Sequence, residues 1–372
     1  MEIVEVDTRV QQQVRMFLDL PFRLYRHMPQ WVPPFAGDAR RMLDRRRHPF
    51  YKHSDAAFYL ALDGRQAVGR LAVLENRNYN TFNRSAAAFF YLFECENDVH
   101  LSNSLFDAAF SWAHGRGLSH IEGPRGFTAL DGLGLLVRGF EHRPALGISY
   151  NPSYYPTLVE AAGFQGIGDV LSGHLRANAP FPERIHQVAE LVQRRRGLRV
   201  GRFRTRRDLR AFVPRLRELY NTSIQNTVGN VPLTEDEVQT IATQMLAFAD
   251  PRLIKVVMKG EELVGFLFAY PDVSAALQRC KGRLLPLGWI DLLLELKRTK
   301  WVNVNGAGIV EKYRGLGGTA LLFSEMCKSI IEGGFEHADI VQIGAENDNM
   351  QRELRGLGID FYKTHRMYGR PL

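Results

Sequence analysis

Two long stretches of the chain, one in each half, are rich in the apolar residues that favour strands and are broken once by a short polar turn. Residues 58–74 read FYLALDGRQAVGRLAVL, and residues 253–270 read LIKVVMKGEELVGFLFAY. Such runs predict β-strands, and the central Asp-Gly and Lys-Gly pairs predict tight turns. Each stretch therefore predicts a β-hairpin, whose second strand opens with a valine followed by Gly69 or Gly265.

The elements expected after the two hairpins come in the same order. Each hairpin is followed by a third strand, an amphipathic helix, another strand and a helix that ends at glycine. The paired ranges are 87–93 and 301–310 for the third strand, 101–116 and 317–332 for the amphipathic helix, and 155–163 and 347–358 for the last helix. A closing strand near 360–368 completes the second half.

This repeated order predicts a mixed α/β (α+β) fold made of two tandem domains. Each domain is expected to hold a mixed central sheet flanked by helices. A chain of 372 residues is also too long for one ordinary core. We place the first domain at residues 1–180, a connecting helix at 181–198 and the second domain at 199–372.

Composition narrows the class of protein. The chain is 45% hydrophobic and 24% charged, as in globular proteins. Cys95, Cys280 and Cys327 lie far apart without metal-type spacing, so we expect neither disulfides nor a metal. The sequence contains no run of about 18 apolar residues, so no membrane span is predicted. The first residues lack a signal-peptide core, so a cytoplasmic location is expected.

Positive charge is in excess and concentrated. The formal net charge is +8, and residues 194–217 hold eleven arginines against one acid, Asp208. Such a stretch is typical of a solvated face near a domain junction, and it also suits a groove for tRNA or an acidic carrier protein. Both readings stay open from the sequence.

A glycine-rich turn lies between the second copy's third strand and its amphipathic helix. Residues 308–322 read GIVEKYRGLGGTALL. Glycines let a backbone approach a ligand closely, and a helix N-terminus favours negative charge, so the turn suits a pyrophosphate. It is neither a Walker loop nor the dinucleotide fingerprint.

This turn resembles the acyl-CoA-binding motif of the GNAT superfamily of N-acyltransferases, R/Q-x-x-G-x-G/A. Arg314 and Gly317 match it, and Thr319 replaces the final small residue. The segment from Asn347 to Ile359 resembles the second hallmark, except that Leu354 stands where the family often has a catalytic tyrosine. Phrases along nearly the whole chain, such as RHPFYKHSDAAFYLA, resemble a bacterial group of tandem-GNAT proteins.

The resemblance implies an acetyl-CoA or other acyl-CoA donor and no metal. It implies that the backbone of the strand end pairs with the pantetheine arm, that N–H groups of the turn hold the pyrophosphate, and that an asparagine contacts the cofactor. The positions that correspond are Ile309, Val310, Arg314, Gly315, Leu316, Gly317, Gly318, Thr319 and Asn347.

The first copy lacks this turn. Between its third strand and helix stand Glu94, Glu96 and Asp98. Carboxylates there would repel a pyrophosphate. We therefore expect a degenerate domain that shapes the acceptor site or an interface.

Acyl transfer to an amine needs a general acid and a neutral amine. Tyr362 and Tyr368, which alternation puts on one face, are candidate acids, with Tyr362 favoured. Glu346 is a candidate base that equally suits a helix-start charge. The third strand offers Asn303 and Asn305, which cannot take a proton. The resemblance implies that Asn303 and Asn305 contact the acceptor. It implies the same for Tyr220, Asn221 and Asn226, which follow the first helix of the second half.

Two further features have plain explanations. The unusually apolar stretch 284–296 (LLPLGWIDLLLEL) fits ordinary packing between the domains, or a groove for a long acyl chain. His48 and His53 lack a third ligand nearby and suit surface or capping roles.

Three functions remain open from the sequence. The first is an N-acyltransferase that moves an acyl group, expected to be acetyl, from acyl-CoA to an amine of a small molecule or amino acid. The second uses an acyl-carrier-protein thioester or an aminoacyl-tRNA as donor. The third is a non-catalytic acyl-CoA-binding protein, which the missing tyrosine keeps open.

Overall fold

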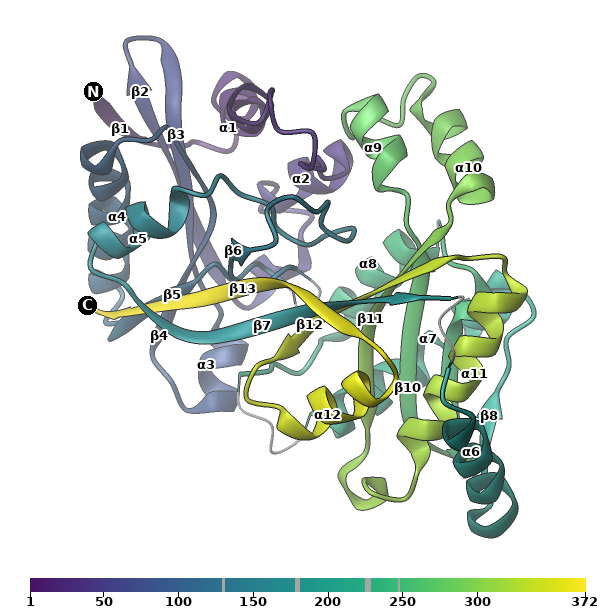
Figure 1. The fold of residues 1–372 in the computed structure, drawn as a ribbon. Coiled ribbons are helices and arrows are strands. Elements are labelled where there is room, and N and C mark those ends of the chain that lie inside the picture. Colours follow the sequence, from purple (N-terminus) through teal and green to yellow (C-terminus); the bar gives the residue numbers. More distant parts are fainter. Residues whose placement is uncertain (129–130, 178–180, 225–228, 247) are drawn as a thin grey trace.

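The computed structural model describes residues 1–128, 131–177, 181–224, 229–246 and 248–372. A single mixed sheet runs through both halves of the chain, with helices on both of its faces (Figure 1). Its strands are β1 (Glu2–Glu5), β2 (Asp55–Asp63), β3 (Gln66–Glu75), β4 (Ala87–Cys95), β5 (His120–Gly123), β6 (Leu135–Arg138), β7 (Gln165–Arg176), β8 (Leu198–Gly201), β9 (Ile254–Lys259), β10 (Glu262–Pro271), β11 (Trp301–Ile309), β12 (His337–Gly344) and β13 (Asp360–Pro371).

The helices lie between these strands, and α4, α5, α11 and α12 fall at the ranges that the sequence predicts. They are α1 (Gln11–Leu24), α2 (Ala36–Met42), α3 (Arg77–Asn83), α4 (Val99–His114), α5 (Tyr155–Ala161), α6 (Glu183–Arg196), α7 (Arg206–Ser223), α8 (Glu235–Leu246), α9 (Ser274–Cys280), α10 (Gly288–Arg298), α11 (Gly318–Glu332) and α12 (Asp348–Gly356). Three short 3-10 helices are η1 (Pro49–Lys52), η2 (Pro251–Leu253) and η3 (Glu311–Tyr313). The predicted hairpins are β2–β3 and β9–β10, and the connecting helix is α6. The mixed α/β fold class is confirmed.

Both hairpins are buried on both faces, in keeping with the nearly continuous apolar runs in their strands. In β2, Ala57, Tyr59 and Ala61 pack with α4 and α5, whereas Phe58 and Leu60 pack with α1. The second half repeats this layering, because β9–β11 lie between α7 on one face and α6, α11 and α12 on the other. Gly69 and Gly265 lie where a neighbouring side chain packs directly against the strand: a Cβ there would lie 2.8 Å from Leu105 Cδ1 and 2.4 Å from Ile309 Cδ1, respectively.

The two halves exchange their last strands. The order in the sheet is β1-β2-β3-β4-β5-β13-β7-β12-β11-β10-β9-β8. The closing strand β13 of the second half thus pairs with β5 and β6 of the first, while β7 of the first half pairs with β12 of the second. β7 and β13 pair with each other along the middle (Figure 1). The division at residues 1–180, 181–198 and 199–372 stays a prediction, and this exchange ties its two parts together.

Candidate functional site

The parallel strands β11 and β12 separate halfway along their length. They pair from Trp301 to Val304 against His337 to Ile340, and the rest of β11 has no β12 partner in the register. β12 meanwhile stays paired with β7 as far as Gly344. Backbone groups on the free edge of a strand are available to an extended ligand.

Local irregularities in both strands produce this separation. In β11 two residues stand opposite one residue of β10 between the Leu267 and Ala269 pairs, and Gly306 there has φ 103°. Such a bulge bends its strand. β12 has a shift between Ile340 and Ile343, where Gln342 (φ 52°) bonds through its side chain to the backbone of Leu133. One bulge bends β11, and the other ties β12 to a loop of the first half.

The glycine turn follows the free end of β11. Gly315 and Gly317 have left-handed φ values of 73° and 86°, which favour glycine. Gly317 is the N-cap of α11 and supplies no side-chain hydrogen bond, and the first turn of α11 holds no acid. The N–H groups of that turn therefore suit an anionic group, which is what the sequence predicts for Gly318 and Thr319.

The turn is also a close contact with α6. A Cβ on Gly317 would lie 2.4 Å from Val192 Cγ2. Arg314 folds back over the strand end, where its Nε donates to the Ile309 carbonyl (3.2 Å) and its Nη2 to the Ser223 carbonyl of α7 (3.1 Å). The backbone of Val310 is anchored on the far side by its N–H bond to the Val264 carbonyl (2.9 Å). Leu316 is half-buried within the turn.

A buried carboxylate lies beside the point where β11 and β12 separate. Asp339 of β12 is 2% exposed, and its Oδ2 accepts from Lys363 Nζ (2.7 Å) and from the Tyr362 hydroxyl (2.9 Å). A register shift in β13 brings both neighbours to the same carboxylate. Burial raises the pKa of Asp339, although Lys363 and Tyr362 oppose that rise. Burial and the nearby Asp339 raise the pKa of the Tyr362 hydroxyl.

Two polar atoms at this place have no partner among the described residues. They are Oδ1 of Asp339 and Nδ2 of Asn303, whose strands pair at these two positions. An unpaired acceptor beside an unpaired donor is costly unless a ligand or water uses them. Asn305 follows two residues along β11, within the bulge opposite β10.

The sequence reasoning missed Asp339 and Lys363. A single carboxylate inside the apolar strand HADIVQIG was the available signal, because burial of a lone charge in a strand requires a partner. That partner, Lys363, is 1% exposed and lies 24 positions away, so only the fold brings the two together.

The structure places the other catalytic candidates apart from this group. Tyr368 packs in the core of the first half, its hydroxyl donating to Glu160 Oε1 (3.1 Å), and a register shift separates it from Tyr362. The expected shared face of these two tyrosines is therefore not found. Glu346 is exposed at the end of β12, beside Asn347, which caps α12 by accepting from the Met350 N–H. The motif position Leu354 is 1% exposed in the apolar core.

The acceptor candidates on α7 have local structural partners. Tyr220 packs near Phe266, and burial raises the pKa of its hydroxyl to about 12. The side-chain amide of Asn221 donates to the Leu233 carbonyl (3.0 Å) and accepts from the Leu233 N–H (2.8 Å). Asn226 lies outside the described residues.

The first half's acids have partners of their own. Asp98 caps α4 by accepting from the His100 and Leu101 N–H groups, and Glu96 pairs with Arg23. Glu94 is largely buried, where its Oε2 accepts from the Tyr155 hydroxyl (2.9 Å). No glycine turn stands here, as the sequence indicates.

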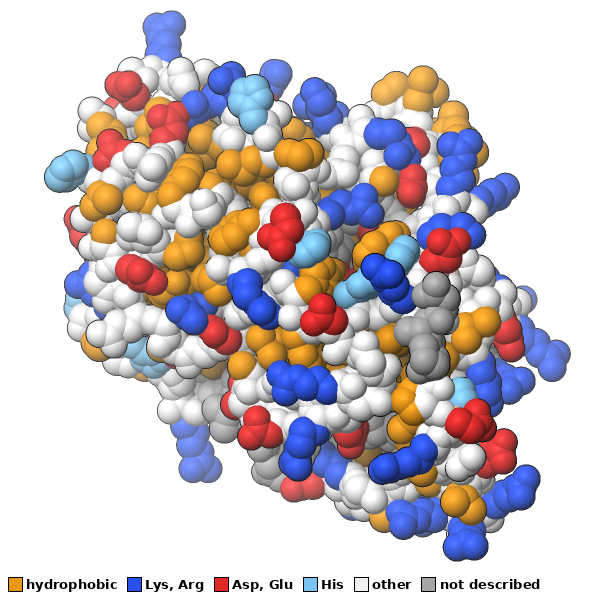
Figure 2. Space-filling model, in the orientation of Figure 1, with side chains coloured by type: hydrophobic (Ala, Val, Ile, Leu, Met, Phe, Trp, Pro, Cys, Tyr) orange, Lys and Arg blue, Asp and Glu red, His pale blue; other side chains and the backbone are white. Residues whose placement is uncertain are grey.

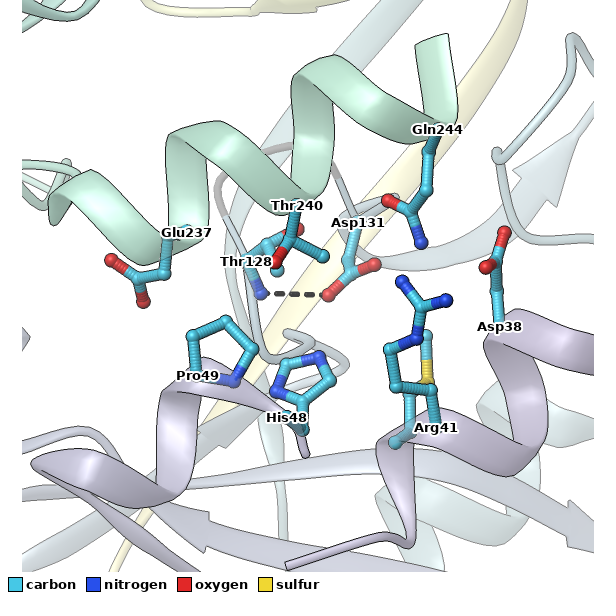
Figure 3. Close-up of a pocket in the computed structure, with 10 residues that line it drawn as sticks. Asp38, Arg41, His48, Pro49, Thr128, Asp131, Glu237, Thr240 and Gln244 are labelled. Atoms are coloured by element: carbon cyan, nitrogen blue, oxygen red, sulfur yellow. Dashed lines mark hydrogen bonds between the residues drawn. The ribbon is translucent and has the colours of Figure 1, made fainter. Parts of the chain in front are cut away.

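A small cavity of about 40 Å³ lies between the halves, away from the separated strands (Figure 3). Figure 3 shows His48 and Arg41 below it, Glu237 of α8 above it, and Asp131 reaching in from a loop. His48 accepts from the Phe50 N–H, and burial lowers the pKa of its ring to about 4. His53 bonds Glu237, which also closes a capping box with Thr234. The volume fits about one water, and both histidines hold local structure.

No group of His, Cys, Asp and Glu in the described ranges could hold a metal ion. Within the same ranges, no helix combines the length and the apolar character needed to cross a bilayer.

Comparison with known proteins identifies the fold. No family model matches the chain. A tandem GNAT protein from the clavulanic acid biosynthesis pathway superposes with a TM-score of 0.57 at 12% identity, over 100% of this chain and 98% of that one. The glucosamine N-acetyltransferase region of a fungal multi-domain β-N-acetylglucosaminidase gives a TM-score of 0.56 at 12% identity, over 99% of this chain and 38% of that one. The chain therefore has the tandem GNAT fold.

Two curated proteins are similar along their whole length. The bacterial ceramide synthase of Caulobacter vibrioides is 27% identical over 99% of this chain and 97% of its own. Protein YghO of Escherichia coli is 24% identical over 96% of this chain and 93% of its own.

Proposed function

We propose that the protein is an N-acyltransferase that joins a fatty acyl group from a CoA thioester to the amine of a long-chain base. The observation that carries this proposal is the joint position of the separated strand edge, the uncapped glycine turn after it and the Asp339–Lys363–Tyr362 group at its root. The activity for which the Caulobacter relative is named, ceramide synthesis, suggests a lipid amine as acceptor and a fatty acyl group in place of the acetyl group expected from the sequence.

The residues divide the binding of the donor between them. Thr319 and the N–H groups of the glycine turn would hold the pyrophosphate, as a helix N-terminus holds anions. The edge of β11 from Ala307 to Val310 would pair with the pantetheine arm. Arg314 would exchange its bond to the Ile309 carbonyl for the donor when it binds.

The reaction forms a C–N bond and breaks the C–S bond of the thioester. Asp339 Oδ1 would accept the proton that the amine must lose, and Asn303 Nδ2 would donate to the oxygen of the tetrahedral intermediate. The Tyr362 hydroxyl, which is hydrogen-bonded to Asp339, would relay that proton to the leaving thiolate, so that both side chains return to their starting state. Lys363 would hold the carboxylate in place.

Charge placed at the helix start tests the donor site. Thr319→Glu puts a carboxylate beside the proposed pyrophosphate position, and Thr319→Gln is the neutral control of equal size. Calorimetric titration with a long-chain acyl-CoA should show a roughly 100-fold weaker Kd for the Glu variant and a near-normal Kd for the Gln variant. Equal binding by both would remove the turn from the donor site.

Product analysis tests the reaction itself. Wild-type protein given palmitoyl-CoA and a long-chain base should form the amide, detected by mass spectrometry, whereas short water-soluble amines should react poorly. Amide formed equally well with short amines would favour the small-molecule acceptor expected from the sequence.

An acyl carrier protein is a second candidate donor, favoured by one observation. The exposed Arg194, Arg195 and Arg196 end α6, the helix whose Val192 touches Gly317. Carrier proteins are acidic and present the same pantetheine thioester. If this donor is used, turnover with acyl carrier protein should exceed that with acyl-CoA, and charge reversal of the three arginines should abolish the difference.

A further inference from the structure

The helical hairpin α9–α10 carries the largest group of exposed hydrophobic side chains in the described part of the chain. Leu285 is 81% exposed and Leu287 is 68% exposed. Their exposed neighbours are Trp289, Ile290, Leu293 and Leu294. The hairpin stands out from the molecule, and Figure 2 shows hydrophobic side chains gathered at its tip. Neither packing between domains nor a groove for an acyl chain, the two explanations suggested by the sequence, accounts for this exposure.

The hairpin is held in place from its inner side. Leu292 is buried against Val273 and Ala276. The Gln278 amide donates to the carbonyls of Pro29 (2.7 Å) and Trp31 (2.9 Å) in the first half. The outer apolar surface is therefore presented by an ordered scaffold that has already buried its own inner stripe.

Positive charge is in excess on the hairpin. The two acids of α10, Asp291 and Glu295, are both paired with Arg279 of α9. Lys281 and Arg283 form a basic rim beside the apolar tip, and Lys297 and Arg298 lie at the other end of α10. All four are exposed, and within the described ranges none of them forms an ion pair with a carboxylate. An apolar tip with a basic rim complements a surface that is apolar inside and anionic outside.

We propose that this hairpin docks on the surface of an anionic phospholipid bilayer. Leu285 and Leu287 enter the boundary between headgroups and acyl chains, Trp289 lies at the interface, and the basic rim contacts lipid phosphates. At 11 residues, α10 is too short to span a bilayer. The proposal rests on the exposed residues themselves and holds whichever acceptor is used.

Docking there would bring the candidate site to the lipid. The hairpin is inserted between β10 and β11, which are the strands next to the candidate site. At its root Asp272 accepts from Arg143 (2.8 Å), and Arg143 in turn offers its carbonyl to Lys363 (3.1 Å). These two hydrogen bonds link the root of the hairpin to Lys363 and so to the candidate site.

Vesicle co-sedimentation tests the proposal with full-length protein. Wild type should bind phosphatidylcholine vesicles that contain phosphatidylglycerol, and the double variant Leu285→Ser with Leu287→Ser should bind at least roughly tenfold more weakly. The matched control is Leu191→Ser with Ile331→Ser, which removes exposed apolar side chains of α6 and α11 and should bind like wild type. Reversal of Arg283, Lys297 and Arg298 to Glu should weaken binding to anionic vesicles roughly fivefold per charge. Raised salt should weaken this binding as well.

Three results would overturn the proposal. One is that wild type does not sediment with anionic vesicles, and another is that the Leu285/Leu287 variant binds them as well as wild type. The third is a stable dimer in analytical ultracentrifugation that this variant dissociates, because the tip would then cover a second copy of the chain. Calorimetry with acyl-CoA should give the same Kd for the variant and wild type, so failure of docking is distinguishable from failure of the proposed activity.

Discussion

The end of β4 in the first half and the end of β11 in the second half occupy the same place in the fold but have different surroundings. In the second half Gly265 pairs with Ile309, the last residue of β11. In the first half Gly69 pairs with Cys95, the last residue of β4, and β4 also leaves its parallel partner β5 early. Both strands carry a bulge with a left-handed residue three positions before their end, Gly306 or Leu92.

What differs is the occupant of the strand edge. The Cys95 N–H donates to the Tyr155 hydroxyl (2.9 Å), and the Tyr154 hydroxyl donates to the Cys95 carbonyl (2.8 Å). In the second half the Ile309 carbonyl accepts from the flexible, exposed side chain of Arg314. The first half has closed its edge with buried aromatic side chains, and the second closes it with a group that a donor can displace. A repeated domain can therefore keep its sheet while losing its ligand site.

The largest expected effect comes from exchanging the buried carboxylate of each half for its amide. Asp339→Asn removes the proposed base, so kcat should fall roughly 100-fold or more while the Kd for acyl-CoA stays unchanged. Glu94→Gln removes a carboxylate of the first half that is held by Arg70, Tyr25 and Tyr155. It should leave kcat unchanged and lower the melting temperature.

Steady-state kinetics with calorimetry separates the two variants. If Glu94→Gln lowered kcat as strongly as Asp339→Asn, the first half would contribute to chemistry and the contrast between the halves would fail.

The sequence predicted the features of the two halves that are set by residues close together in the chain. The apolar runs and their Asp-Gly and Lys-Gly turns located both hairpins, and the glycines at 315–318 indicated a backbone that a ligand can approach closely. Acids at 94, 96 and 98 indicated a degenerate first copy. The tyrosines that fill its edge were not predicted, because α5 lies about 60 residues after β4 and nothing local links Tyr155 to Cys95.

Long-range strand pairing explains the other omissions. The exchange of β7 and β13 has no local signature, and it creates the Asp339–Lys363 pair. The apolar stretch 284–296 predicted burial because hydrophobicity alone does not say whether a surface faces the protein or a partner. The ion pairs of Asp291 and Glu295 with Arg279 show which face of α10 is turned toward α9.

The next effect is on stability. Tyr155→Phe removes a hydroxyl that serves both Glu94 and the Cys95 N–H, so it should destabilise the protein by about 2–3 kcal/mol in chemical denaturation. Tyr150→Phe, which loses one bond to the Phe140 carbonyl, is the matched control and should cost about 1 kcal/mol. Acyl-CoA binding should not change in either variant. Any new acyl-CoA site gained by Tyr155→Phe would show that the hydrogen bond from the Cys95 N–H, and not the aromatic ring, keeps the first half from binding the donor.

The smallest effect concerns the loop after β5, which reaches α8 of the other half. Burial raises the pKa of Asp131 in this loop to about 6, although the Thr128 N–H (2.7 Å) opposes the rise. The folded state therefore binds a proton more tightly than the unfolded state does, and stability should fall as pH rises from about 4 to about 6. The loss should be about 1–2 kcal/mol, because partial exposure screens the carboxylate. Asp131→Asn keeps the acceptor oxygen and should show no such fall, making it more stable than wild type at pH 7 in denaturant titrations. A variant that follows the wild-type pH profile would assign the titration to another group and leave this loop without an electrostatic role between the halves.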